Sequence, residues 1–232
     1  MNNSKDKSKI PCSVCAIVPF YNEKATLNKV LAETAKYVHF TFAVNDGSND
    51  DTYEDERKIE NVKFIDLEKN YGKGKALNVG FKEAILSGYD SIVTLDADLQ
   101  HEPKYIPDLI QDLKSFDFDI VIGNRLNNLN GMPVQRRLSN KLTSFFLTTK
   151  TGQKILDSQC GFRAYSAEVL RKVKTNYFGF EAESEILVKA AKKEFKIGFV
   201  DIPTIYSDEN SKMRPVQAII GFLKVIFMKV EG

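Results

Sequence analysis

The stretch SIVTLDADLQ, residues 91–100, determines the predicted fold and indicates where its site lies. Residues 91–95 form a short, mostly apolar run that is typical of a buried strand, and two aspartates follow it. Because alternate side chains near a strand end face the same side, Asp96 and Asp98, with Gln100, are expected to converge just beyond it. Alone, such a triplet is more typical of a solvated turn. At the end of a strand in an α/β series, it predicts a site for a hard divalent cation, Mg²⁺ or Mn²⁺.

Short apolar runs alternate with amphipathic stretches on both sides of this strand. Strands are expected over residues 13–19, 40–44, 62–67, 119–123 and 197–206. Helices are expected over residues 23–38, 76–86, 106–113, 134–150, 181–194 and 214–230. The alternation predicts an α/β fold, a mostly parallel sheet with helices on both faces and ligands at the carboxyl ends of the strands.

Composition narrows the class of protein. The 232 residues include 33 Lys and Arg against 31 Asp and Glu, a formal net charge of +2, so we expect no nucleic-acid partner. No apolar run reaches the roughly 20 residues that cross a bilayer, and the first ten residues lack the apolar core of a signal peptide. Three cysteines are too few for a disulfide framework. These features predict a cytoplasmic location.

Two further polar stretches follow predicted strands. In NDGS, residues 45–48, Asp46 could accept hydrogen bonds from a base or ribose, although a plain strand-to-helix turn explains the stretch as well. In NYGKGKALN, residues 70–78, glycines and lysines before a helix favour an anion, with Lys73 as the expected contact. The stretch matches neither common phosphate-loop pattern, and a glycine-rich helix start with solvated lysines is the alternative.

These stretches occur in a fixed order with VPFYNE, residues 18–23, and three later motifs: GNR at 123–125, RLSN at 137–140 and DSQCGFRAY at 157–165. Together they resemble the family 2 glycosyltransferases of the GT-A fold, from about residue 13 to residue 215. The later motifs most resemble the dolichyl- or polyprenyl-phosphate mannosyl- and glucosyltransferases. The resemblance implies a disordered basic tail over 1–12, a GT-A domain over 13–212 and an amphipathic interfacial or docking helix over 213–232.

The resemblance also implies roles for single residues on the donor side. Four would hold the nucleoside of a nucleotide sugar: Pro19, Tyr21, Glu23 and Asp46. Asp96 and Ala97 would lie against its ribose and diphosphate, with Asp98 and Gln100 on the metal. Lys212 would reach the diphosphate.

The acceptor side rests on cationic residues. The resemblance implies that Arg125, one of Arg136 or Arg137, and Ser139 face an acceptor phosphate, and we add Arg163 as a candidate. Arginine can grip a phosphate with two parallel hydrogen bonds, although solvated or structural arginines are the alternative.

The acceptor decides whether a base is needed. A lipid monophosphate is already an anion at neutral pH and needs positioning, whereas a sugar hydroxyl needs a general base. Glu183, Glu181 and Asp157 are the candidates, although carboxylates in the first turn of a helix also suit its dipole.

Departures from the family pattern leave alternatives open. Asn45 stands where the family often has Asp, Tyr206 where the mannosyl branch usually has Arg, and the pair of transmembrane helices of many relatives is missing. The leading hypothesis is inverting, metal-dependent transfer of a hexose from a GDP-mannose or UDP-glucose type donor to polyprenyl or dolichyl phosphate. The alternatives are transfer to a glycan hydroxyl, a nucleotidyltransferase and a non-catalytic nucleotide-sugar-binding subunit.

The leading hypothesis places the chain peripherally at the cytoplasmic face of a membrane. Residues 214–230 carry a broad apolar face with a narrow polar stripe, which is typical of a helix lying in the membrane surface. Packing on its own domain or on a membrane-anchored partner subunit would explain the same pattern.

Overall fold

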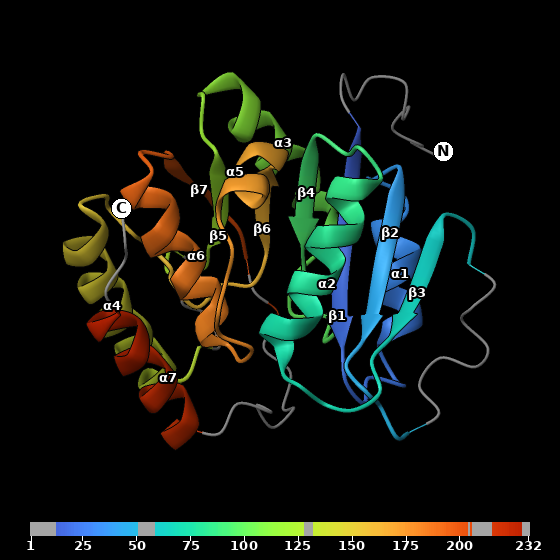
Figure 1. The fold of residues 1–232 in the computed structure, drawn as a ribbon, viewed down its shortest axis with the longest axis horizontal. Coiled ribbons are helices and arrows are strands. Elements are labelled where there is room, and N and C mark those ends of the chain that lie inside the picture. The colour runs from blue at the N-terminus through green and yellow to red at the C-terminus, as the bar shows by residue number, and fades with distance from the viewer. Residues whose placement is uncertain (1–12, 51–58, 128–131, 204, 206–214, 229–232) are drawn as a thin grey trace.

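The computed structural model describes residues 13–50, 59–127, 132–203, 205 and 215–228. Seven strands form one mixed sheet in the order β3-β2-β1-β4-β6-β5-β7 (Figure 1). The strands are β1 (Val14–Phe20), β2 (Phe40–Asn45), β3 (Val62–Asp66), β4 (Ser91–Thr94), β5 (Ile120–Asn124), β6 (Arg163–Ser166) and β7 (Ile197–Asp201). The helices are α1 (Leu27–Thr34), α2 (Lys73–Leu86), α3 (Ile106–Ser115), α4 (Val134–Thr151), α5 (Ala167–Lys172), α6 (Glu181–Lys192) and α7 (Pro215–Phe227). The α/β prediction is confirmed.

Strand β1 lies inside the sheet beside the middle strand, β4, and its seven residues are all buried. It pairs in parallel with β2 on one side and β4 on the other. A continuous apolar run is what a strand with helices on both faces requires, and this explains why the sequence shows no alternation here. In register, Ile17 pairs with Thr94 and Pro19 with Val44, so the carboxyl ends of β1, β2 and β4 meet at one edge.

One strand, β6, was not predicted. It runs antiparallel between β4 and β5, with Val93 opposite Ala164 and Ile122 opposite Arg163. Its sequence, RAYS, has no apolar run, because two of its buried side chains are those of Arg163 and Tyr165. A periodicity search for apolar residues therefore passes over it.

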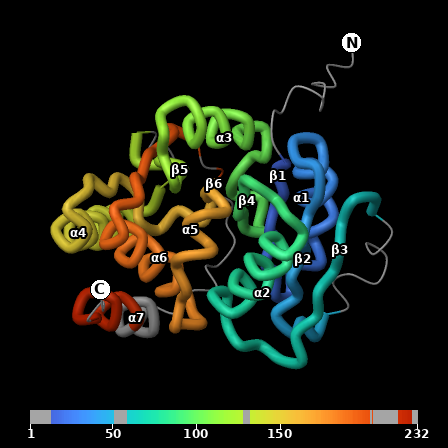
Figure 2. The backbone as a smooth tube through the Cα atoms, turned by 45° about the horizontal axis from the view of Figure 1, so that its top comes forward, coloured from blue at the N-terminus to red at the C-terminus, as the bar shows by residue number. Residues whose placement is uncertain are grey.

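Helices α4, α6 and α7 pack together beside the β5–β7 end of the sheet (Figure 2). Nζ of Lys150 donates to the carbonyl oxygens of Ile226 and Met228, at 2.6 and 3.0 Å, and so ties the end of α4 to the end of α7. Val225 is fully buried, and Phe222 packs against Phe146 with ring centroids 6.1 Å apart. Part of the apolar face of α7 therefore packs on its own domain. Among the described residues, no helix has the length and apolar character needed to cross a bilayer.

Candidate active site

The two aspartates of the D-x-D triplet lie directly beyond β4, as expected. Asp98 accepts a hydrogen bond from the backbone N–H of Gln100 at 3.0 Å. Burial, followed by the nearby charge of Asp96, raises the pKa of Asp98 to about 6. In the described part of the chain, no group of three or more His, Cys, Asp and Glu side chains is arranged to hold a metal ion. Two carboxylates and an amide still fit Mg²⁺ or Mn²⁺, which commonly take their remaining ligands from water and substrate phosphates.

Lys73 lies between two carboxylates from different parts of the chain. Its Nζ is 2.6 Å from Oδ1 of Asp96 and 3.0 Å from Oε2 of Glu183. Burial would lower the pKa of Lys73, but the two carboxylates more than offset it and hold that pKa above its ordinary value. Burial likewise would raise the pKa of Asp96, and Lys73 reverses the shift. Lys73, the cation that we expected at the donor, therefore links the start of α2 to the residues after β4 and to the first turn of α6.

The glycines of residues 70–78 have a packing role. A Cβ on Gly72, whose φ is +106°, would lie 2.5 Å from the carbonyl oxygen of Phe178. A Cβ on Gly74 would lie 2.5 Å from the Cβ of Ala182. These glycines let α2 approach the start of α6, and the contact of this loop with an anion stays a prediction.

The absence of a side chain at Gly161 leaves the space that the Lys73–Asp96 pair occupies. A Cβ at this position would lie 2.6 Å from Nζ of Lys73 and 2.7 Å from Oδ2 of Asp96. The carbonyl oxygen of Gly161 accepts a hydrogen bond from Oγ1 of Thr94 at 2.9 Å. The loop before β6 is therefore fixed against the strand that carries the D-x-D triplet.

The expected nucleoside contacts lie at the same edge of the sheet. Pro19 belongs to β1, and Tyr21 and Glu23 follow that strand half-buried. Ala97 is buried beside the two aspartates. The carboxylate of Asp46 accepts the backbone N–H groups of residues 71 and 72 at 2.9 and 2.8 Å. Asp46 therefore holds the loop before α2, and its contact with a nucleoside stays a prediction.

Two neighbours of Asp46 have structural partners. Gly47 has a φ of +72°, and a Cβ there would lie 2.4 Å from the backbone carbonyl carbon of Lys69, so this glycine allows the two backbone segments to approach closely. Asn45, the departure from the family pattern, donates to Asp66 at 3.2 Å and accepts from the backbone N–H of Ser48 at 2.8 Å. Its amide fixes the turn that carries Asp46.

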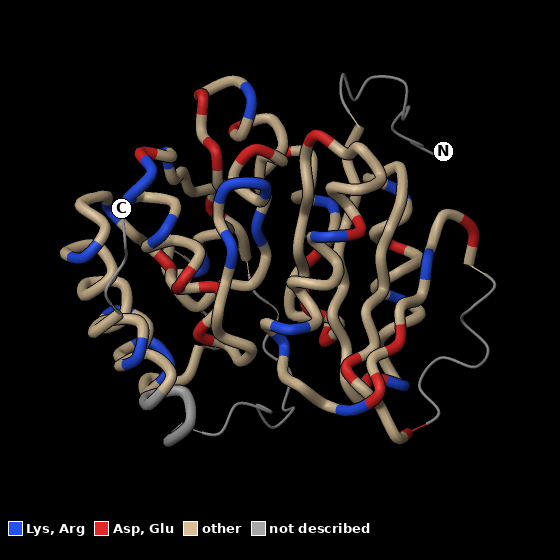
Figure 3. The backbone as a smooth tube through the Cα atoms, in the orientation of Figure 1, with Lys and Arg blue, Asp and Glu red and all other residues tan. Residues whose placement is uncertain are grey.

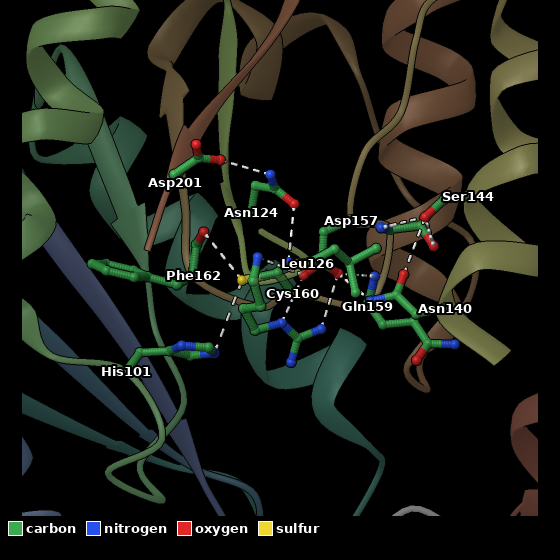
Figure 4. A network of polar contacts seen from close by, with 12 residues as sticks. His101, Asn124, Leu126, Asn140, Ser144, Asp157, Gln159, Cys160, Phe162 and Asp201 are labelled. Carbon is green, nitrogen blue, oxygen red and sulfur yellow. Dashed lines mark hydrogen bonds and ion pairs between the residues drawn. The ribbon is translucent and has the colours of Figure 1, made fainter. Parts of the chain in front are cut away.

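Arg125 is held by a buried carboxylate, that of Asp157. Its Nε and one terminal nitrogen donate to the two oxygens of Asp157 at 2.7 and 2.9 Å. Asp157 is fully buried and also accepts from Nδ2 of Asn140 at 2.6 Å and from the backbone N–H of Gln159 at 3.2 Å (Figure 4). Burial alone would raise the pKa of Asp157, but the hydrogen bonds and charge of Arg125 lower it. A carboxylate bound in this way orients Arg125 and is poorly placed to act as a base.

The prediction that Arg163 faces an acceptor phosphate is wrong. Its side chain has no exposed surface. Its guanidinium donates to the carbonyl oxygens of Cys160, Glu183 and Ser158 at 2.7, 2.9 and 2.9 Å. Arg163 therefore fastens the loop before β6 to the first turn of α6, and the motif that contains it is structural at this position.

The other acceptor candidates lie in the first turns of α4. Arg136 and Arg137 are half-buried and Ser139 is exposed. Oγ of Ser139 accepts a hydrogen bond from Nε2 of Gln159 at 3.1 Å, so it adjoins the loop that carries Asp157. Their contact with an acceptor stays a prediction, and Lys212 lies outside the described residues.

Several residues of this region were not predicted. Asn140 and Ser144 are buried on α4, and Ser144 donates to Oδ1 of Asn140 at 3.1 Å. His101 is 4% exposed and stacks on Phe162 with ring centroids 5.7 Å apart. Burial, then the charge of Arg125, lowers the pKa of His101 to about 4. The sequence does contain a signal for the buried pair on α4, because polar residues stand four positions apart at 140 and 144, on one face of the predicted helix.

Known proteins resemble this chain along most of its length. A family model described as glycosyl transferase family 2 matches residues 15–174. The UDP-N-acetylglucosamine–dolichyl-phosphate N-acetylglucosaminyltransferase of Methanococcus voltae is 34% identical over 228 residues, which cover 89% of this chain and 90% of that protein. The dolichol-phosphate mannosyltransferase of Pyrococcus furiosus is 33% identical over 236 residues, covering 94% of this chain and 64% of that protein.

Solved structures agree on the fold. Glucosyl-3-phosphoglycerate synthase from Mycobacterium tuberculosis, in complex with Mn²⁺, UDP and phosphoglyceric acid, superposes with a TM-score of 0.72 at 21% identity, over 97% of this chain and 82% of that one. A complex of the same synthase with Mg²⁺ and UDP gives a TM-score of 0.69. The expected GT-A fold is confirmed, and the chain belongs to glycosyl transferase family 2 and is a glycosyltransferase.

Proposed function

We propose that this enzyme transfers a hexose, with inversion, from a nucleotide sugar to the phosphate of a polyprenyl or dolichyl lipid. The names of both relatives described above include a dolichyl phosphate acceptor. One of those names includes a UDP-N-acetylglucosamine donor, so an N-acetylated hexose belongs among the donors to test beside GDP-mannose and UDP-glucose. Transfer would take place at a membrane surface, because the acceptor is a membrane lipid, and we propose the cytoplasmic face as its side.

One observation carries the choice of a phosphate acceptor. Two of the three candidate bases already contact cations, Asp157 with Arg125 and Glu183 with Lys73 and, at 3.8 Å, Arg163. The carboxylates of Asp157 and Glu183 are also buried, whereas Glu181 is half-buried in the first turn of α6. A lipid monophosphate needs no base, since its second pKa lies near 6 and it is an anion at neutral pH. Arg125, oriented by Asp157, would position that anion.

The donor would bind at the carboxyl ends of β1, β2 and β4. Asp96, Asp98 and Gln100 would hold Mg²⁺ or Mn²⁺, and the cation would neutralise the charge that develops on the leaving nucleoside diphosphate. Pro19, Tyr21 and the other residues at this edge would hold the nucleoside. The structural neighbours support this use of a metal, since they contain Mn²⁺ or Mg²⁺ together with UDP.

A glycan hydroxyl is the second candidate acceptor. It is favoured by Oε1 of Glu183, which has no hydrogen-bond partner among the described residues although it is buried. In that reaction Glu183 would take the hydroxyl proton. The Glu183→Gln variant separates the two acceptors: it would abolish transfer to a hydroxyl and leave transfer to a phosphate measurable.

The test is transfer of label from a nucleotide sugar into lipid. Purified protein is incubated in detergent with Mn²⁺, a short polyprenyl phosphate and one of three labelled donors: GDP-mannose, UDP-glucose or UDP-N-acetylglucosamine. We expect label in the organic phase with one donor, none with EDTA and none with the Asp98→Asn variant. Metal-dependent nucleotide binding without lipid product would contradict the phosphate acceptor and favour a glycan hydroxyl.

A further inference from the structure

Helix α4 turns its polar residues inward. Its buried residues are Asn140, Ser144 and Leu147, and two of these are polar. Asn140 donates to Asp157, and Oγ of Ser144 accepts a hydrogen bond from the backbone N–H of Ser158 at 3.0 Å. A surface helix of a globular protein normally buries its apolar stripe and exposes its polar face. The inner face of α4 therefore serves the site in place of an apolar core.

The outer face of α4 is correspondingly apolar. Val134, Leu138, Leu142 and Phe145 are 74, 68, 54 and 65% exposed. They are four, four and three residues apart, so they form one stripe along the helix, which we name the outer stripe. A contiguous exposed apolar surface of this kind marks an interface with a partner or a membrane.

The outer stripe continues onto α7. Phe145 and Phe146 are neighbouring rings, 5.8 Å apart at their centroids, and Phe146 contacts Phe222 of α7. On α7, Leu223 and Phe227 are 46 and 79% exposed. The two helices lie side by side in both views of the backbone (Figures 1 and 2). Two adjacent helices thus expose apolar side chains at the same end of the molecule.

The charges of these two helices are all of one sign. Neither residues 134–151 nor residues 215–227 include an aspartate or glutamate. Arg136, Arg137, Lys141 and Lys224 are at least partly exposed, and Figure 3 shows only basic positions along α4 and α7. Apolar side chains flanked by long cationic ones suit an anionic lipid surface, because the cations reach the headgroups while their stems lie along apolar chains.

We propose that the outer stripe of α4, with Leu223 and Phe227 of α7, inserts into the surface of an anionic membrane so that α4 lies in the membrane plane. This deepens the proposed function and rests on it in one respect: the inner face of α4 holds Asp157, which orients Arg125, so docking brings the acceptor site to the lipid headgroups. The docking element is then mainly α4, whereas the sequence indicated residues 213–232.

The test is flotation of the purified protein with vesicles that contain no acceptor lipid. The Leu138→Gln/Leu142→Gln variant removes two side chains of the outer stripe. The matched control is Leu86→Gln/Phe116→Gln, which removes two side chains that are 72 and 61% exposed, at the end of α2 and directly after α3. We expect the stripe variant to bind vesicles of mixed anionic and neutral phospholipid at least about tenfold more weakly than wild type does, and the control to bind them like wild type. Equal partitioning of all three proteins would overturn the proposal.

Two further measurements separate other outcomes. If the wild-type chain is a dimer that ignores vesicles and the stripe variant is a monomer, the stripe is a contact between copies and the proposal is wrong. With a short, water-soluble polyprenyl phosphate, we expect the stripe variant to transfer sugar at the wild-type rate. Vesicle binding by a wild-type protein that transfers no sugar to any phosphate acceptor would contradict the proposed function and leave the docking surface intact.

Discussion

The two halves of the molecule bury different kinds of side chain. In residues 13–100 the sheet is apolar inside, and Asp46 is the one buried charged residue among those described, since Lys73 and Asp96 keep more exposed surface. Among the described residues of 101–228, five charged side chains are buried: Arg125, Asp157, Arg163, Glu183 and Glu185. The N-terminal half is built as an ordinary apolar core that presents the donor site at its edge, whereas the C-terminal half is shaped by hydrogen-bonded charges.

The charges of the C-terminal half are paired. Arg125 bonds to Asp157, and Glu185 contacts Lys189 at 2.7 Å and accepts the backbone N–H groups of residues 176 and 177. An unpaired buried charge costs several kcal/mol, so such networks persist only with good geometry. They also fix positions more narrowly than apolar contacts do. The C-terminal half therefore contributes orientation of the acceptor side more than it contributes stability.

The largest effect should come from breaking the network at its centre. Asp157→Ala leaves the buried guanidinium of Arg125 and the amide of Asn140 without their acceptor, and we expect it to lower the free energy of unfolding by roughly 3–5 kcal/mol. Urea denaturation measures this loss. The Arg125→Met/Asp157→Ala double variant is the control and should recover part of it. A loss below about 1 kcal/mol for Asp157→Ala would show that the Arg125–Asp157 pair contributes no more to the free energy of unfolding than a surface ion pair does.

The same pair predicts a dependence on pH. Because the folded pKa of Asp157 is lowered, its stabilising effect is fully present above the pKa of the unfolded state and is lost as the pH falls through the folded pKa. The stability difference between wild type and Asp157→Asn should thus narrow as the pH falls below about 4, the ordinary pKa of an aspartate. A difference that stays constant on acidification would contradict the ion pair.

The comparison also explains what could be predicted from the sequence. Strands β1 to β4 follow from their apolar runs, and the D-x-D triplet follows from its place after β4. Strand β6 could not be predicted, because its buried Arg163 is satisfied by backbone carbonyl oxygens, such as that of Glu183, and backbone partners leave no pattern in the sequence. Periodicity also does not say which face of α4 is buried, because the general rule would turn Leu138 and Phe145 inward.

Arg163 offers the next test of the C-terminal half. Arg163→Lys keeps the charge but cannot reach three carbonyl oxygens at once, and we expect a loss of about 1.5–3 kcal/mol in the free energy of unfolding. Thermal and urea denaturation measure it. If the variant is as stable as wild type but loses affinity for the acceptor phosphate, the buried, structural role assigned to Arg163 is wrong.

A smaller effect is expected where the two halves meet. Gly161→Ala would push a Cβ against the Lys73–Asp96 pair, so we expect metal-dependent nucleotide binding to weaken about tenfold with little change in stability. Titration calorimetry measures the binding. Gly88→Ala is the matched control, because Gly88 has a φ of +79° but a Cβ added there would meet no atom within 4 Å. It should lose stability and bind the nucleotide normally.

The smallest effect should come from an ion pair of the N-terminal half with the same shortest distance between nitrogen and oxygen as the central pair. Nζ of Lys63 lies 2.7 Å from Oε2 of Glu83, the distance found between Arg125 and Asp157, but its two side chains are 53 and 29% exposed. Water screens such a pair, so Lys63→Ala should cost less than about 1 kcal/mol in urea denaturation. With the distance held constant, the contrast with Asp157→Ala then measures burial and the additional hydrogen bonds. Suppose that Lys63→Ala lowers the free energy of unfolding as much as Asp157→Ala does. Burial would then add nothing to the strength of the Arg125–Asp157 pair, and buried charge would not be what holds the acceptor side in place.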